Sequence, residues 1–140
     1  MKKLILMCCA TLFMAASSYA ITPPELVVKA FNKKFPNATK VSWGKEAAKE
    51  YEAEFTFEGK KISANFFEDG TWLETEKQIP ASELPKAVQS AVKTKYPGWT
   101  IKEADMTDTA KHGAIYEVDL KMGKKKKSAA FKEDGSLVKE

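Results

Sequence analysis

The sequence predicts an α+β domain in which two tandem α–β repeats form one antiparallel sheet of about eight strands, with two helices on one face. The first observation is an internal match: residues 66–73 read Phe-Phe-Glu-Asp-Gly-Thr-Trp-Leu, and residues 131–138 read Phe-Lys-Glu-Asp-Gly-Ser-Leu-Val. The second is that an apolar helical stripe ends twice in an aromatic residue and proline, at Phe35-Pro36 and at Tyr96-Pro97. An Asp-Gly pair between apolar runs is a strong hairpin signal, so both copies should contain paired strands.

The N-terminus has the features of a secretory signal peptide, predicted at residues 1–20. Two lysines are followed by an apolar run from Leu4 to Ala16 and then by Ser18-Tyr19-Ala20, a small-x-small site for cleavage after the alanine. The run is shorter than the roughly 20 residues of a membrane span, so we expect an exported protein, periplasmic or secreted, without stable membrane insertion. Cys8 and Cys9 leave lipidation open as the alternative, although the residues just before them are not small.

Residues 21–140 are expected to form a single domain made of two repeats, about 22–80 and 81–140. Both cysteines lie in the leader, which excludes disulfides, a thiol nucleophile and a cysteine-based metal site from this domain. The chain has no arginine, and loss of the leader lysines lowers its net charge from +4 to about +2. Arginine supplies the planar fork preferred for guanine and phosphate, so nucleic acid is not expected as a partner.

The first helix is predicted to begin after Thr22, because Thr22 and Glu25 are spaced as a capping box around two prolines. It should end at Phe35, since Pro36 disfavours helical geometry in the residue before it. One apolar stripe at helical spacing is expected to face the sheet. It comprises Leu26, Val27, Ala30, Phe31 and Phe35.

Two turns set the predicted register of the first repeat. If Glu58-Gly59 and Asp69-Gly70 are both two-residue turns, the second places Phe67 opposite Trp72. Side chains alternate along a strand, so the residues divide between a face buried under the helix and an open face. The predicted buried face holds Tyr51, Ala53, Phe55, Ile62, Ala64, Phe66 and Leu73. The predicted open face holds Glu50, Glu52, Glu54, Thr56, Lys61, Ser63, Asn65, Phe67, Trp72, Glu74 and Glu76. A preceding strand over residues 39–43 is also expected.

The second repeat is predicted to keep the buried face and to change the open face, where Lys132 and Leu137 stand in place of Phe67 and Trp72. The aromatic–proline pairs are 61 residues apart and the Asp-Gly pairs 65, so about four extra residues are expected, in a loop over the polar stretch 105–113. Matching apolar positions occur in the helix and strands. They are Leu84, Ala87, Val88, Ala91, Val92, Tyr96, Tyr116, Val118, Leu120, Ala129, Phe131 and Val138.

The sequence offers little catalytic or metal-binding chemistry. His112 is the only histidine, and it has no companion ligand at useful spacing. Glu52, Glu54, Glu74 and Glu76 cluster on the predicted open face, where paired carboxylates could do acid–base work only if one of them were desolvated. A solvated face is the expected interpretation, with weak cation binding as an alternative, so neither an enzyme activity nor a cofactor is predicted.

The run from Lys124 to Lys127 makes the second hairpin strongly basic. It is expected to be a solvated hairpin whose lysines discourage edge-to-edge aggregation. Attraction to an anionic membrane surface or to an acidic partner remains the alternative.

Two units, each with a helix ending in aromatic-Pro and a hairpin at Glu-Asp-Gly, resemble the PepSY-like family of periplasmic proteins, whose fold is similar to that of the β-lactamase-inhibitory protein. The resemblance runs from Pro23 to Val138. It implies helices on one face of an antiparallel sheet and a role in binding or inhibiting other proteins. It brings no catalytic residues, and the disulfides of the inhibitory protein have no counterpart in residues 21–140.

We therefore predict an exported, non-enzymatic binding module, such as a protein inhibitor, that acts on an unknown periplasmic or envelope protein through the open face. The candidate anchor is the cross-strand pair Phe67 and Trp72, inside a polar rim of Glu50, Asn65 and Glu74. A plainer interpretation is that the pair reinforces its hairpin. The alternative function is a structural or envelope-stress protein that forms a homodimer through this face.

Overall fold

The computed structural model describes residues 21–138, and the predicted leader at residues 1–20 lies outside them. Within the described range the chain forms two α-helices and one antiparallel sheet of seven strands, one fewer than predicted. The elements are α1 (Glu25–Lys34), β1 (Thr39–Ala47), β2 (Glu50–Phe57), β3 (Lys60–Phe67), β4 (Trp72–Gln78), the 3₁₀ helix η1 (Ala81–Glu83), α2 (Lys86–Lys95), β5 (Thr100–Thr109), β6 (Gly113–Met122) and β7 (Lys125–Lys132). No helix among these residues is long and apolar enough to cross a membrane.

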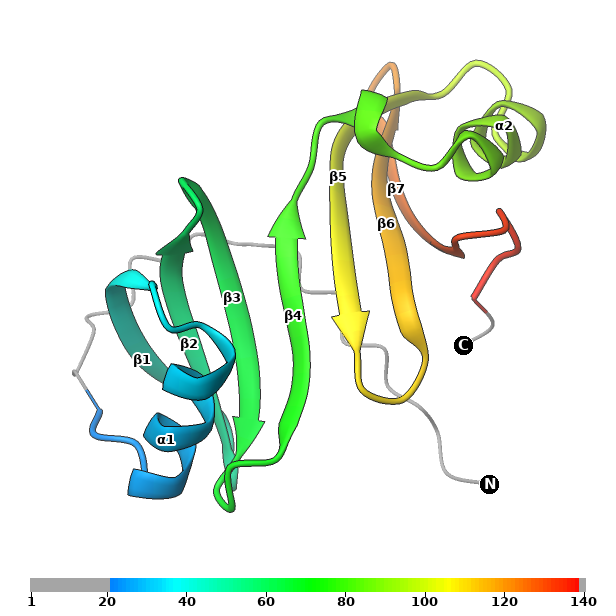
Figure 1. Ribbon diagram of the computed structural model, residues 1–140. Coiled ribbons are helices and arrows are strands. Elements are labelled where there is room, and N and C mark those ends of the chain that lie inside the picture. The colour runs from blue at the N-terminus through cyan, green and yellow to red at the C-terminus, as the bar shows by residue number, and fades with distance from the viewer. Residues whose placement is uncertain (1–20, 139–140) are drawn as a thin grey trace.

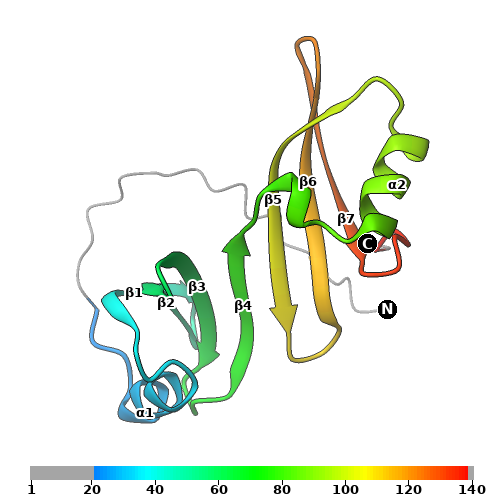
Figure 2. The same ribbon diagram turned by 45° about the horizontal axis from the view of Figure 1, so that its top comes forward.

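The sheet is a meander, in which the strands lie side by side in chain order and each pairs antiparallel with the next (Figure 1). The register keeps Ala53 and Ala64 of β2 and β3 on the same side as Val118 and Ala129 of β6 and β7. Both helices pack on that side, α1 over β2 and β3 and α2 over β5 to β7. Figure 2 shows the helices at opposite ends of the twisted sheet.

The buried side chains form two hydrophobic clusters, one under each helix. The α1 cluster is rich in aromatic rings: the centroid of Phe31 lies 4.9 Å from that of Phe55 and 6.3 Å from that of Phe66. The buried α1 cluster comprises Val27, Phe31, Phe35, Ala53, Phe55, Ala64 and Phe66. The more aliphatic α2 cluster comprises Ile79, Leu84, Val88, Val92, Ala104, Tyr116, Val118, Leu120, Ala129 and Phe131. Each half therefore has its own core.

The helices end as predicted and begin differently. Helix α1 ends at Lys34 and α2 at Lys95, immediately before the two aromatic–proline pairs. The predicted capping box at Thr22 does not form, because Pro24 is the N-cap and the helix begins two residues too late for that cap. Leu26 was also placed wrongly by the stripe prediction, since it is 56% exposed.

The β2–β3 turn follows the prediction, but the β3–β4 turn does not. Glu58 and Gly59 have φ angles of 51° and 77°, the two positive values that a type I′ turn requires. In the next turn only Gly70 has positive φ, at 86°. There the Asp69 carboxylate accepts a hydrogen bond from the Thr71 amide at 2.8 Å, which favours a longer turn.

The longer turn changes the register of β4 near its start. Phe66 pairs with Trp72, and an irregularity separates this pair from the regular pairing of Asn65 with Glu74. Trp72 therefore packs against the α1 cluster on the helix side. The predicted pairing of Phe67 with Trp72 on the open face is wrong.

Two predictions for the second half are also wrong. The stretch 105–113 is not a loop, because β5 continues to Thr109 and pairs with both β4 and β6. Its polar composition reflects a strand whose alternate side chains face away from the core. The expected eighth strand is reduced to one isolated bridge, in which Leu137 pairs with Phe131.

The glycine of each Asp-Gly pair lies directly against a helix. A Cβ added to Gly70 would lie 2.7 Å from the carbonyl oxygen of Leu26, and one added to Gly135 would lie 2.6 Å from that of Ala87. Neither distance is compatible with a real Cβ, so a side chain at either position would force the helix and hairpin apart. These two contacts set how closely each helix approaches its hairpin.

The substitution Gly70→Ala is expected to destabilise the protein more than Gly59→Ala. Both glycines have positive φ, which costs another residue about 1–2 kcal/mol. A Cβ at Gly59 meets open space, whereas one at Gly70 meets α1, and the forced repacking should add about 1–3 kcal/mol. Urea unfolding followed by tryptophan fluorescence measures both losses. Equal losses would show that the α1 contact does not constrain the turn.

Candidate functional site on the open sheet face

The side of the sheet without helices, called here the open face, carries aligned carboxylates. The register places Glu52, Asn65 and Glu74 opposite one another across β2, β3 and β4, and we call these three residues the Glu–Asn–Glu row. The next row along the same strands comprises Glu54, Ser63 and Glu76. Adjacent side chains in such rows are about 5 Å apart at Cβ, so the two carboxylates of each row are about 10 Å apart, with one polar side chain between them.

The open face continues into the second half of the sheet. Asp105 of β5 lies opposite Glu117 of β6, and Glu103 lies opposite Asp119. Sequence reasoning missed Asp105, because its stretch was expected to be a loop. The signal that identifies a strand there is the alternation of polar residues with apolar ones such as Met106, which packs on the α2 cluster.

Burial and crowding raise the pKa of several of these carboxyl groups. Burial raises the pKa of Glu76 to about 7, and repulsion from Asp105 is the next cause. Burial also raises the pKa of Asp105 to about 6, with repulsion from Glu117 adding to it. The pKa values of Glu52 and Glu74 are raised by burial first and by neighbouring carboxylates second. The open face therefore holds protons at pH values where isolated carboxyl groups have lost them.

An open groove of about 550 Å³ runs over β1 to β5 on this side. Its lining includes more acids than lysines. They are Glu52, Glu54, Glu76, Glu103 and Asp105, against Lys40, Lys61 and Lys77. A smaller hollow of about 330 Å³, lined by residues 78–81 and 102–104, lacks such a convergence of charged side chains. The groove is thus the better candidate for recognition.

Asn65 is the most enclosed polar side chain of the open face. It is only 8% exposed. No hydrogen bond joins its carboxamide to another residue of the described chain, and its polar atoms retain contact with solvent. The open side is therefore where the carboxamide can form hydrogen bonds with a ligand or with water.

Phe67 supplies an apolar element at the end of the same face. It lies opposite Glu50 in the β2–β3 pairing and is 41% exposed. The structure thus brings Phe67, Glu50, Asn65 and Glu74 together on the open face, as the sequence predicted. Trp72, the fifth predicted site residue, is not among them.

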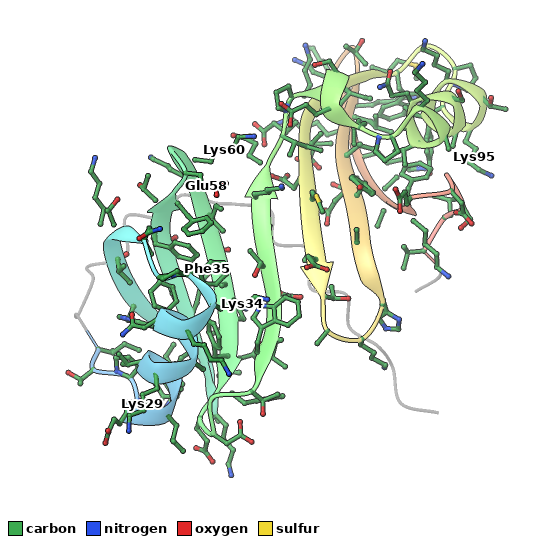
Figure 3. All side chains as sticks on the ribbon, viewed as in Figure 1. Lys29, Lys34, Phe35, Glu58, Lys60 and Lys95 are labelled. Carbon is green, nitrogen blue, oxygen red and sulfur yellow. The ribbon has the colours of Figure 1, made fainter. Side chains whose placement is uncertain are left out.

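Trp72 serves the helix side of the sheet instead. Its indole Nε1 donates a hydrogen bond to Thr75 Oγ1 at 3.0 Å. Lys34, at the end of α1, extends toward β4 and places its Nζ 3.7 Å from the centre of the Trp72 ring (Figure 3). Trp72 therefore ties α1 to β4, a role that depends on the register irregularity and has no signal in the sequence.

The open face has features of a recognition surface. Residues 21–138 hold no group of three or more His, Cys, Asp and Glu side chains placed to bind a metal ion. His112 lies in the β5–β6 turn, where its backbone amide donates to Thr109 Oγ1 at 2.9 Å. The raised pKa of Glu76 has burial and other carboxylates as its causes. An exposed aromatic ring beside partly buried polar groups is the anatomy of a binding face.

Comparisons with known proteins agree with this fold. Residues 49–139 match the family model described as "Putative beta-lactamase-inhibitor-like, PepSY-like". A BLIP-like protein from Bacteroides fragilis NCTC 9343 is 25% identical, with a TM-score of 0.75 over 85% of each chain. A DUF2874 family protein from Bacteroides ovatus ATCC 8483 is 25% identical, with a TM-score of 0.77 over 85% of this chain and 86% of that one. No curated protein matches the chain.

A third solved structure shows the same fold at lower identity. It is from Bacteroides eggerthii DSM 20697 and is described among "putative periplasmic proteins". The two chains are 19% identical, with a TM-score of 0.76 over 85% of this chain and 88% of that one. The architecture is therefore kept among sequences that differ at most positions.

The free energy of unfolding is expected to fall as pH rises from about 4.5 to 7. In this window the folded protein keeps the proton of Glu76, whose pKa is about 7, while the unfolded chain releases it, so raising the pH favours unfolding. Asp105, with a pKa of about 6, adds to the same trend. The pKa of Asp69 is lowered by hydrogen bonds from Thr71, and its opposite effect lies below this window.

The variant Glu76→Gln should flatten this dependence, because Gln cannot bind the proton. Urea unfolding at about pH 5 and about pH 7.5 measures the slope. The control Glu133→Gln removes one carboxylate outside the open-face rows and should keep the wild-type slope. The same slope in wild type and Glu76→Gln would show that Glu76 is not the source of the proton uptake.

Proposed function

The chain belongs to the family described as putative beta-lactamase-inhibitor-like, PepSY-like proteins, and from this premise we propose that it is an exported, non-enzymatic binding module. It holds a periplasmic or envelope protein on the open face of its sheet. The single observation that supports this most strongly is the enclosed, unpartnered Asn65 between Glu52 and Glu74, next to the exposed ring of Phe67. A surface on which an enclosed amide has no hydrogen-bond partner within the described chain, and on which an aromatic ring is exposed, is suited to a partner that covers both.

The family supports a binding role without naming a target. The Bacteroides fragilis relative is described as BLIP-like, and inhibition of another protein is the form of binding that this likeness suggests for the present chain. At 25% identity the likeness does not carry a partner with it. The proposal therefore rests on the chemistry of the open face of this chain.

We also propose that the two halves are copies of one unit. Tyr51 pairs with Phe66 across β2 and β3, and Tyr116 pairs with Phe131 across β6 and β7, at the same spacing of 65 residues. The contacts of the two turn glycines with α1 and α2 are equivalent as well. On this view the isolated bridge at Leu137 corresponds to the start of β4. Only the first copy carries a phenylalanine at the Phe67 position.

The alternative, a structural or envelope-stress protein that self-associates through the open face, fits the charges less well. A symmetric dimer through this face would bring the Glu–Asn–Glu rows and the Glu54 and Glu76 carboxylates of two copies together. Like charges brought together in this way cost binding free energy. A partner with complementary charge avoids this cost.

Export predicts that the mature protein begins at Ile21. The expected observation is an intact mass of periplasmic material that lacks residues 1–20, because Ser18-Tyr19-Ala20 follows the apolar run. Protein that retains these residues, or that carries a lipid on Cys8 or Cys9, would contradict the proposed compartment.

The variant Phe67→Ser should weaken capture of the partner from periplasmic extract. Loss of an aromatic anchor from an interface typically costs about 2 kcal/mol or more, which is a roughly 30-fold loss of affinity. The matched control is Leu26→Ser, which removes an exposed apolar side chain from the helix layer and should capture normally. Trp72 is left intact, because it packs against α1.

Two results would contradict the proposal. Capture by Phe67→Ser at wild-type strength would show that the open face does not hold the partner. A stable homodimer in size-exclusion chromatography that Phe67→Ser dissociates, with no other protein captured, would favour self-association.

A further inference from the structure

The Glu–Asn–Glu row presents three side chains that need hydrogen-bond donors. Glu52 and Glu74 lie on either side of Asn65, on three neighbouring strands. The only side-chain hydrogen bond recorded for these carboxylates within the described chain joins Glu52 to Ser63. A ligand in this row must therefore bring donors, and it must tolerate two negative charges.

The enclosure of Asn65 narrows the choice of ligand further. Its side chain is only 8% exposed and makes no hydrogen bond within the described chain. Its carbonyl oxygen can accept a hydrogen bond from the same group that the carboxylates attract. An anion would be repelled and an apolar group would leave three polar side chains unsatisfied, whereas an ammonium or guanidinium group offers several donors and a positive charge.

Other charges on the open face reinforce this selection. Glu46 lies close enough to Glu52 and Glu74 to raise the pKa of both, and Glu50 and Glu54 add to the effect. Lys40 and Lys61 line the adjoining groove, and neither is a member of the Glu–Asn–Glu row. The row thus lies in a negative field, in which a cation gains from all the surrounding carboxylates.

We propose that the partner is a protein segment that inserts a lysine or arginine side chain between Glu52 and Glu74, with its charged group against Asn65. This inference rests on the proposed function and names the chemistry of the partner. Phe67 lies one row further along β3 on the same face, where its exposed ring can pack against the aliphatic stem of the basic side chain. A free polyamine has similar methylene stems, so the test below compares the two ligands directly.

Binding of the cation should release protons. The charged groups facing the row are Glu46 from β1, Glu50 and Glu54 from β2, Lys61 from β3 and Glu76 from β4, with Thr109 of β5 opposite Glu74. Carboxylates outnumber lysines among them. An added cation lowers the pKa values that burial and repulsion raise, so affinity should increase from about pH 5 to about pH 7.5.

The test uses N-acetyl-pentalysine amide as the probe, with the same peptide acetylated on every lysine as its uncharged control. Isothermal titration calorimetry of residues 21–140 at low ionic strength should show binding of the lysine peptide at least tenfold tighter than the control. The double variant Glu52→Gln with Glu74→Gln should bind at least tenfold more weakly. The matched double variant Glu117→Gln with Asp119→Asn, which removes two β6 carboxylates from the same face outside the groove lining, should bind within twofold of wild type.

Asn65→Leu separates a binding role from a structural one. Leucine has the same number of side-chain heavy atoms and the same branching as asparagine, and it removes an amide that has no hydrogen-bond partner within the described chain. The midpoint of urea unfolding should therefore be unchanged or higher. Affinity for the lysine peptide should nevertheless fall at least fivefold. A lower unfolding midpoint with unchanged affinity would show that Asn65 is structural and would overturn the proposal.

Three further results would overturn it. Equal losses of affinity for the lysine peptide in the two double variants would show that the peptide binds by general charge attraction and not at the Glu–Asn–Glu row. Spermine binding as tightly as the lysine peptide would identify a small polyamine as the ligand. Normal capture of the natural partner by Glu52→Gln with Glu74→Gln, alongside loss in Phe67→Ser, would refute the basic side chain while leaving the proposed function intact. Loss in neither variant would instead refute the proposed function itself.

Discussion

The register of the seven-stranded meander is the constraint on which the rest of this structure depends. Side chains alternate between the two sides of each strand, so a single register decides which residues meet the helices and which meet solvent. Ala53 and Ala64 lie under α1 only because Glu52 and Asn65 lie on the open face. A slip of one residue would bury carboxylates beneath α1 and expose its core. The hydrophobic clusters therefore hold the acidic rows in place.

Strand β4 has an unusual position in this arrangement, because it joins two halves that have separate cores. Six of its seven residues are half-buried and none is fully buried. Its connection to the second half is the ladder with β5, from the pair Glu74–Thr109 to the pair Gln78–Asp105. The Lys34–Trp72 contact adds a tie from α1 to the same strand. The shape of the open face thus depends on backbone hydrogen bonds more than on shared apolar packing.

Local sequence signals predicted much of this fold, and the two turns of the first half show where they fail. A Cβ at Gly59 would meet open space, so no packing contact constrains this turn. The intrinsic preference of Glu58-Gly59 for a two-residue turn therefore determines its conformation. Gly70 is pressed against α1, and Asp69 bonds to Thr71, so tertiary contact and side-chain chemistry override that preference. Four candidate site residues lie on the open face as predicted, because the pairing of β3 with β4 is regular from Asn65 and Glu74 onward. The enclosure of Asn65 could not be predicted, since it depends on how tightly β2 and β4 flank β3.

The acidic rows reduce the free energy of unfolding, and this loss of stability arises at the candidate site on the open face. Carboxylates whose pKa values are raised by burial and mutual repulsion destabilise the folded state near neutral pH. In the second half the hydroxyl of Ser128 donates to Asp119, which relieves part of the cost there. Asn65 has no such relief within the described chain. A sheet selected for stability alone could alternate charges across these rows or place an apolar residue at Asn65. The proposed partner, with its basic side chain, would supply this row with the positive charge and the hydrogen bonds that the described chain does not provide.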